Sequence, residues 1–376
     1  MDALIVVVII IVVLAIVAGI GVMLIARRNI GYLKQNPKLV AKAQMTEKTV
    51  TTPDGVTLAY GEGPAPAGSE SKPPLLLIHG QAVSWRDYAA VLPQLTAKYH
   101  VYAVDCPGHG HSAKDPSLYS ATAIGKQLAW FAESVIGRPV LASGHSSGGL
   151  LVTWLAANHP DLVAGIVVED APYFATQTGR REKTFAFIDS FSTIHDYLEA
   201  TEPRPGEPEP DPKERPSYLV FYLGRSYIKT WVGKGWDRLV AHVTGWVKNH
   251  PGEVPHLFWL PRSMNEAFDQ SACLQDGTGD YDLRFGDTFY TGRWFDGFNQ
   301  GDTLKQVKRP TTILHTSVRE ERGILLGAMS DADAQNAHLF IKDSTLIGGI
   351  KSPHNIHANH PDVVVDAIDK LAAQVG

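Results

Sequence analysis

The sequence predicts an α/β fold: a mostly parallel central sheet with helices on both faces, plus a mainly helical insertion. Short apolar runs bounded by glycine or polar residues alternate with segments of helical spacing. This alternation is typical of a parallel sheet covered by crossover helices. It stops after Pro172 and resumes near residue 310, which predicts an insertion between two halves of one sheet domain.

The composition of the N-terminal residues predicts a transmembrane helix. Residues 4–26 carry no charged side chain and are rich in Val, Ile, Leu and Ala. At about 1.5 Å per residue, such a helix spans a hydrocarbon layer of about 30 Å. We expect residues 1–28 to form an uncleaved single-pass anchor, and a cleaved export signal or a buried core helix remain as alternatives. Basic residues follow the span, and by the positive-inside rule they predict that the rest of the chain lies in the cytoplasm: Arg27, Arg28, Lys34, Lys38, Lys42 and Lys48.

The rest of the chain divides into a connector, two core segments and the insertion. Residues 29–48 form a polar, basic connector, and "KTVTTPDGVTLAY" predicts a hairpin. The first core segment, residues 49–172, holds the predicted strands "LLLIHG", "HVYAVDCPGHGHS", "PVLASGHS" and "LVAGIVVEDAP". The second, residues 310–376, holds "TTILHTS", "STLIGGI" and a helix over residues 361–375.

We expect residues 173–309 to form a mainly helical cap. Their acidic, proline-rich piece "EPRPGEPEPDPKERP" is incompatible with a helix or a central strand, so we expect an exposed loop. We expect the aromatic side chains around it to form the core of the cap: Tyr218, Phe221, Tyr222, Trp231, Trp236, Trp246, Phe258 and Trp259.

Composition narrows the possible partners. The 376 residues are 44% hydrophobic and carry a net charge of -5, which argues against a nucleic-acid partner. Cys106 and Cys273 give neither a disulfide framework nor a CxxC metal motif. We find no phosphate-binding loop or flavin motif, so no cofactor is expected. The sequence does not indicate an oligomeric state.

The stretch "LASGHSSGGL" contains the pattern G-x-S-x-G, with Ser146 at its centre. In this motif the nucleophile occupies a tight strand-to-helix turn, where side chains at its flanks would collide. A predicted strand precedes the motif and a predicted helix follows it, as the turn requires. Gly144 and Gly148 flank Ser146, whereas Ser147 would have His145 at the crowded position. We therefore expect Ser146 to be the nucleophile and the backbone N–H of Ser147 to face an oxyanion.

These motifs resemble the α/β-hydrolase fold family, in its serine esterase and lipase-like form with an inserted cap. The resemblance covers residue 49 to the C-terminus and is weaker in the cap. "LLLIHGQAVSWRDY" is similar to the family's His-Gly segment, which implies that the N–H of Gln81 completes the oxyanion hole. "DCPGHGHS" resembles the family's D-x-P-G-x-G-x-S loop, where we expect structural roles for His109 and His111.

The general base is expected in "SPHNIHANHP". The family pattern has a His followed by a Pro seven residues later, which implies His354 with Pro361 and leaves His357 as a packing or hydrogen-bonding residue. Here Pro353 replaces the usual preceding glycine. His354, His357 and His360 also read H-x-x-H-x-x-H, but there is no H-E-x-x-H motif and no clear fourth ligand. We therefore expect no metal, although a zinc hydrolase is an alternative.

A carboxylate must orient the histidine and stabilise its cation. Asp170 lies just beyond the strand "GIVVE" and is ranked first, as in family members with the acid at that position. Glu169 is ranked second and Glu320 third. Side-chain alternation turns Glu169 and Asp170 to opposite faces, so one of them should reach His354. We expect Asp105 to be structural.

Together these residues predict a membrane-anchored serine hydrolase that cleaves carboxylic esters, with lipophilic esters suggested by the anchor and the aromatic cap. Lactone, amide or carbon–carbon hydrolysis by the same triad is an alternative, as is a non-catalytic binding protein. A serine at position 146 argues against dehalogenase and epoxide hydrolase activities, which need an aspartate there.

Overall fold

The computed structural model describes residues 3–203, 216–250, 253–272 and 280–376. An eight-stranded sheet lies at its centre, and only β2 pairs antiparallel, with β1 and with β4. The strand order is β1 (Thr46–Thr51), β2 (Thr57–Glu62), β4 (Val101–Val104), β3 (Leu75–Ile78), β5 (Val140–His145), β6 (Val163–Glu169), β7 (Thr311–Thr316) and β10 (Ser344–Ile350). The predicted hairpin and strands therefore agree with the structure.

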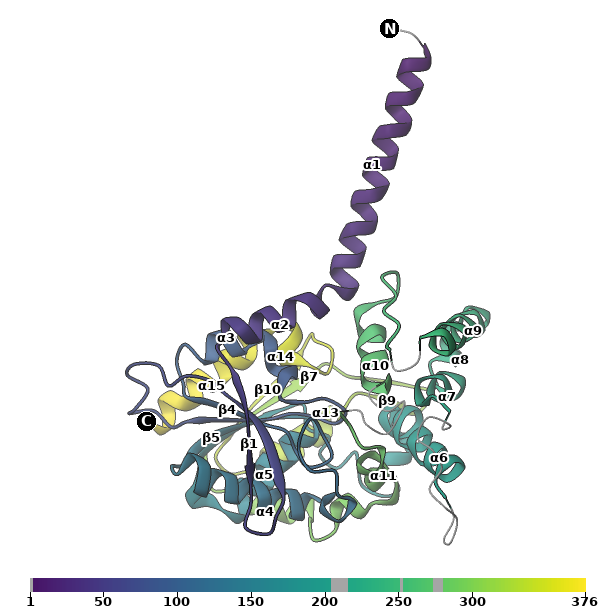
Figure 1. The fold of residues 1–376 in the computed structure, drawn as a ribbon. Helices are drawn as coiled ribbons and strands as arrows, with labels where there is room; N and C mark the ends of the chain where they lie inside the picture. Colours follow the sequence, from purple (N-terminus) through teal and green to yellow (C-terminus); the bar gives the residue numbers. More distant parts are fainter. Residues whose placement is uncertain (1–2, 204–215, 251–252, 273–279) are drawn as a thin grey trace.

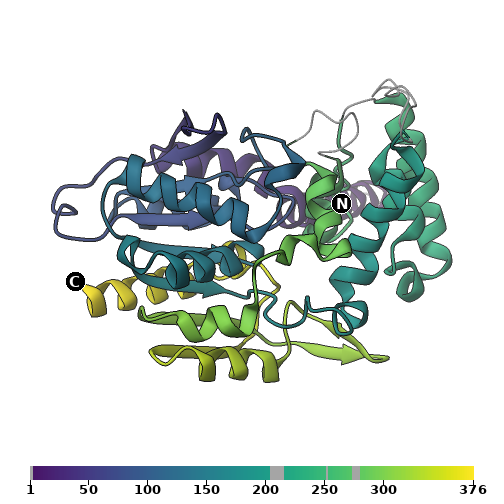
Figure 2. The same ribbon diagram turned by 90° about the horizontal axis from the view of Figure 1, so that it is seen from below.

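Helices cover both faces of the sheet (Figures 1 and 2). Along β3, Leu75 and Leu77 join one buried cluster while Leu76 and Ile78 join the other, so this strand is apolar on both sides. The first cluster includes residues of η1 (Trp85–Ala90), α3 (Leu92–Leu95), α14 (Ile356–Asn359) and α15 (Pro361–Val375). The second includes residues of α4 (Ala121–Phe131), α5 (Ser147–Asn158), α12 (Gln300–Gln306) and α13 (Asp331–Phe340). A small hairpin of β8 (Arg319–Glu321) and β9 (Ile324–Leu326) follows β7.

The helical insertion lies between β6 and β7, beside one end of the sheet (Figure 2). Its main helices are α6 (Ser192–Thr201), α7 (Tyr218–Arg225), α8 (Lys229–Val232), α9 (Lys234–Asn249), α10 (Arg262–Ala272) and α11 (Leu283–Thr291). Most of the predicted proline-rich loop, residues 204–215, falls outside the described residues.

The expectation that the cap aromatics form its core is partly wrong. Tyr218, Tyr222 and Trp236 are buried. Trp231, Phe258 and Trp259 are instead 40%, 40% and 52% exposed. Trp236 belongs to the buried hydrophobic cluster, and its indole N–H donates to the carbonyl of Leu223 at 2.8 Å, whereas the exposed rings lie in a short helix and a loop.

The N-terminal helix α1 (Ala3–Ile30) projects away from the body of the molecule (Figure 1). Residues 5–30 are long and apolar enough to cross a membrane, and the apolar window is not buried against the protein. The predicted connector contains a second helix, α2 (Tyr32–Lys42), which packs against η1 and α3 of the core. Tyr32 is its buried residue, and its hydroxyl donates to Asp269 of the cap.

Candidate active site

Ser146 occupies a strained turn between β5 and α5. Its φ of 55° and ψ of -120° are rare for a residue with a side chain, and such strain clusters at functional sites. Glycine is required on both sides. A Cβ on Gly144 would lie 2.2 Å from the carbonyl oxygen of Gly148, and one on Gly148 would lie 2.1 Å from that of Ile78. The backbone N–H of Ser146 donates to the carbonyl of Glu169 at 2.8 Å, which ties the turn to the end of β6.

The loop after β3 lies directly against this turn. A Cβ on Gly80 would come within 3.1 Å of the Cβ of Ser146, so the backbone approaches the serine as closely as glycine permits. Within the part of the chain that the structure describes, the N–H groups of Gln81 and Ser147 have no hydrogen-bond acceptor. Ser147 begins α5, where such unpaired N–H groups favour negative charge. Both predicted oxyanion donors are therefore free to bind a ligand oxygen.

A hydrogen bond between His354 and Asp170 joins the last loop to the end of β6. Nδ1 of His354 lies 2.7 Å from Oδ2 of Asp170, and the ring centroid of His354 is 4.5 Å from that of His145, the neighbour of Ser146. The His354 side chain is 40% exposed, whereas Asp170 is fully buried. Pro353 therefore does not prevent the loop from bringing His354 to the predicted acid.

Asp170 is held as a carboxylate by several partners. Burial would raise its pKa, but hydrogen bonds with His315 and His354 and with the backbone N–H of Thr316 outweigh this effect and hold the pKa well below its usual range. The Thr316 hydroxyl also donates to Oδ2 at 3.1 Å. His315 contacts Asp331 as well, at 2.8 Å, and its pKa is raised because the two carboxylates outweigh its burial.

A second buried cluster lies beside the first. His357 Nδ1 is 2.9 Å from Oε1 of Glu169, and its Nε2 is 3.1 Å from Oδ2 of Asp87. The backbone N–H of His357 also donates to Glu169 at 2.8 Å. Burial alone would lower the pKa of His357, but the two carboxylates raise it to about 10, so its imidazolium bridges them.

Two members of this cluster, Asp87 and His357, also belong to a group of side chains whose spacing could hold a metal ion. Ligand atoms of Asp87, His145 and His357 lie within 4.8 Å of one another. Both nitrogens of His357 already contact carboxylates, and burial lowers the pKa of His145 to about 4. The predicted histidine triplet does not converge on one point, since the Nε2 of His360 instead contacts the carbonyl of Lys351.

The remaining predicted residues lie apart from this centre. Glu320 is exposed in β8, paired with Leu325. Asp105 is buried and accepts hydrogen bonds from the backbone N–H groups of Trp85 and His111, as expected of a structural residue. His109 is buried and His111 contacts Glu47, so both have structural contacts.

A pocket of about 540 Å³ lies between the core, α2 and α10 of the cap. It is lined by Ala82, which follows Gln81, by Asn355, which follows His354, and by Asp87 of the buried cluster. Helix α2 and the short segment after it contribute Tyr32, Asn36, Pro37, Val40, Ala41 and Met45, and the cap contributes Glu266, Asp269 and Gln270. The pocket thus adjoins the loops that carry the predicted base, His354, and one of the two predicted oxyanion donors, Gln81.

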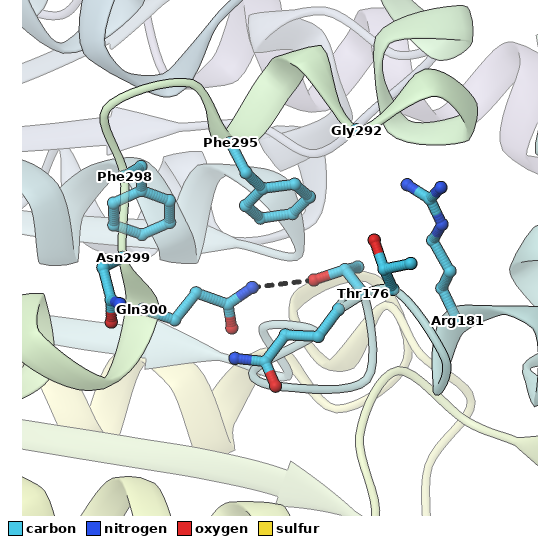
Figure 3. A pocket seen from close by; sticks show the side chains of 9 residues that line it. Thr176, Arg181, Gly292, Phe295, Phe298, Asn299 and Gln300 are labelled. Carbon is cyan, nitrogen blue, oxygen red and sulfur yellow. Dashed lines mark hydrogen bonds between the residues drawn. The ribbon is translucent and has the colours of Figure 1, made fainter.

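A second pocket, of about 240 Å³, lies where the insertion leaves and rejoins the core (Figure 3). The rings of Phe295 and Phe298 lie on one side, and Gln300 donates from Nε2 to the Thr176 hydroxyl at 2.9 Å. None of its lining residues belongs to the predicted catalytic set.

Comparison with known proteins finds one family model and several relatives that match part of the chain. Residues 73–192 match the model of the alpha/beta hydrolase fold family. The chain is 34% identical over 104 residues to pimeloyl-[acyl-carrier protein] methyl ester esterase from Edwardsiella ictaluri, covering 27% of this chain and 38% of that protein. It is 32% identical over 111 residues to (E)-2-((N-methylformamido)methylene)succinate hydrolase from Acinetobacter baylyi, covering 28% of this chain and 41% of that protein. The chain thus spans less than half the length of these relatives.

The fold extends further than the sequence similarity. The crystal structure of a membrane phospholipase A, described as a bacterial virulence factor, superposes with a TM-score of 0.59 over 97% of each chain, at 19% identity. The chain therefore has the α/β-hydrolase fold, with a helical insertion and an apolar N-terminal helix. Its relatives with esterase and hydrolase names support a hydrolase.

Proposed function

We propose that the protein is a membrane-anchored serine hydrolase that cleaves carboxylic esters with Ser146, His354 and Asp170. The contact between His354 and Asp170, beside the strained turn of Ser146, carries this proposal. A buried carboxylate that fixes one ring nitrogen leaves the other free to act as a base. The ester-cleaving relative supports ester chemistry, and Asp170 is favoured over Glu169 because Glu169 binds a different histidine.

The proposed reaction proceeds through an acyl-enzyme. Nδ1–H of His354 donates to Asp170, so Nε2 accepts the proton of Ser146 Oγ as the oxygen attacks the acyl carbon. The N–H groups of Gln81 and Ser147 stabilise the oxyanion of the tetrahedral intermediate. His354 then protonates the leaving alcohol. Water, activated by the same histidine, releases the carboxylic acid and restores Ser146.

The proposed substrate is lipophilic and reaches the site from the membrane side. Helix α1 is long and apolar enough to span a bilayer, and α2, which follows it directly, forms one wall of the 540 Å³ pocket. A substrate in that pocket would lie next to the loops of Gln81 and His354. The proposal includes a cytoplasmic catalytic body, which the basic residues after the span support through the positive-inside rule.

The full-length protein in detergent should be assayed with p-nitrophenyl esters of graded chain length and with a fluorophosphonate probe. We expect ester turnover and labelling at Ser146, both lost in Ser146→Ala. Ser147→Ala keeps its backbone N–H and should still be labelled at Ser146. A wild-type protein that shows neither turnover nor labelling would rule out the esterase. Chelator-sensitive turnover that survives Ser146→Ala would instead indicate a zinc hydrolase.

A further inference from the structure

We propose that the cap carries a membrane-docking surface, made of Trp231, Val232, Phe258 and Trp259, that rests on the lipid bilayer at the base of α1. This surface is separate from the catalytic residues. The proposal rests on the membrane anchor proposed above and adds a second, peripheral contact with the same bilayer.

Exposed apolar side chains are concentrated at this place. Outside α1, the large exposed hydrophobic residues of the described chain are Trp231, Val232, Phe258, Trp259 and Leu339. Four of the five belong to two short segments of the cap, one in α8 and one just before α10. Scattered single residues of this kind need no explanation, but two pairs of adjacent large side chains in one subdomain indicate a contact surface.

The end of α1 sets the position of Phe258 and Trp259 relative to the bilayer. The Nδ2 group of Asn29, in the last turn of α1, donates to the carbonyl oxygen of Phe258 at 2.8 Å. Asn29 directly follows Arg27 and Arg28, the first basic residues after the apolar run. A helix that spans a bilayer places such residues among the lipid headgroups. Phe258, and with it the adjacent Trp259, therefore lies at headgroup level.

Further contacts hold the cap against the base of α1. Helix α1 packs against α10, and the guanidinium of Arg262 in α10 lies 5.1 Å from the ring centroid of Tyr32. Figure 1 shows α8, α9 and α10 on the side of the molecule from which α1 leaves. Helix α8, which carries Trp231 and Val232, thus lies on the same side of the molecule as the anchor.

The chemistry of the surface fits a bilayer. Tryptophan is enriched at membrane–water interfaces, where its apolar ring and polar N–H meet both environments. The segment from α8 to α9 also has an excess of exposed basic side chains over the single acid Asp237: Lys229, Lys234, Arg238 and Lys248. Basic residues near a membrane surface are attracted to anionic lipids. We favour the bilayer over a second copy of the chain as the partner of this surface, because the contact between Asn29 and Phe258 ties the surface to the end of the membrane anchor.

Lipid-borne quenching of tryptophan fluorescence tests the proposal in the full-length protein, reconstituted in nanodiscs of phosphatidylcholine and phosphatidylglycerol. Nitroxide-labelled lipids quench tryptophans at the bilayer and spare those elsewhere. We expect Trp259→Phe to remove most of the lipid-quenchable emission, and Trp231→Phe to remove a smaller share. The matched control is Trp294→Phe, which removes a fully buried ring and should leave the lipid-quenchable emission unchanged.

Each other outcome has a distinct meaning. If Trp259 emission is spared by nitroxide lipids but quenched by acrylamide, the ring faces water and the proposal is wrong. If neither agent quenches it and the protein elutes as a larger species, a second copy covers the surface, which also refutes the proposal. Protein that separates from the nanodiscs at high pH would instead show that the anchor itself has failed.

Discussion

Glu169 and Asp170 are neighbours at the end of β6, yet each binds a different histidine of the segment between β10 and α15. Glu169 contacts His357 at 2.9 Å and Asp170 contacts His354 at 2.7 Å. Asp170 lies just beyond β6 with a φ of 45°, outside the regular strand conformation, and the two carboxylates reach different partners. The end of β6 therefore positions both His354 of the proposed triad and the buried His357.

Asp170→Asn should lower kcat by about 10³–10⁴-fold, because an amide no longer selects the His354 tautomer that leaves Nε2 basic. The change is isosteric, so the protein should fold. Turnover of a short p-nitrophenyl ester with titrated active sites measures the effect. Glu320→Gln, at an exposed position of β8, is the matched control and should keep wild-type kcat. Full activity in Asp170→Asn would mean that another acid serves His354.

Glu169→Gln should act mainly on stability. It leaves the His357 imidazolium with one carboxylate in a fully buried site, and breaking such a pair typically costs about 3–5 kcal/mol. We expect a lower unfolding midpoint in urea, together with fluorophosphonate labelling of Ser146 in the molecules that remain folded. A variant as stable as the wild type, but inactive, would make Glu169 the acid of the triad.

The free energy of unfolding should fall as the pH rises through the range in which His357 loses its proton. The folded protein holds the pKa of His357 at about 10, above the value of about 6.5 for an unperturbed histidine. Its contribution is therefore complete below about pH 6.5 and is lost as the pH approaches 10. Urea unfolding at several pH values measures this slope. His357→Gln should lack it, and an equal slope in both proteins would contradict the assignment.

Gly148→Ala should destabilise the nucleophile turn. The added Cβ would lie 2.1 Å from the carbonyl oxygen of Ile78 and 2.5 Å from that of His79, which forces the backbone to shift. We expect a loss of about 1–3 kcal/mol in the free energy of unfolding and reduced labelling of Ser146. Gly245→Ala in α9 is the control, since its Cβ meets nothing within 4 Å and alanine favours a helix. Equal stability of the two variants would count against steric demand at Gly148.

Much of the core was predictable because its rules act over short stretches of sequence. A parallel strand buried on both faces must be apolar throughout, as "LLLI" is, and a nucleophile turn needs glycine where Gly144 and Gly148 stand. The contact between Asp170 and His354 was predictable for a related reason. Both follow strands, and the ends of parallel strands gather at one edge of the sheet.

Contacts that depend on distant packing were not predictable. Asp87 lies 270 residues from His357 in the chain, and nothing in "SWRDY" distinguishes its carboxylate from an exposed one. The cap presents the same difficulty, because Trp236 and Trp231 occur in similar surroundings and only the packing of α7 against α9 decides which is buried. The sequence also showed no sign that His315 and Thr316 of β7 form hydrogen bonds with Asp170.

Helix α2 has a consequence for where the chain can be shortened. A truncation after residue 30 removes the apolar span but keeps the six residues between 32 and 45 that line the 540 Å³ pocket. A truncation after residue 45 takes away that wall, together with the hydroxyl of Tyr32 that bonds Asp269 in the cap. A water-soluble fragment intended for inhibitor screening should therefore begin at Gly31 or Tyr32, so that the 540 Å³ pocket keeps all of its lining residues.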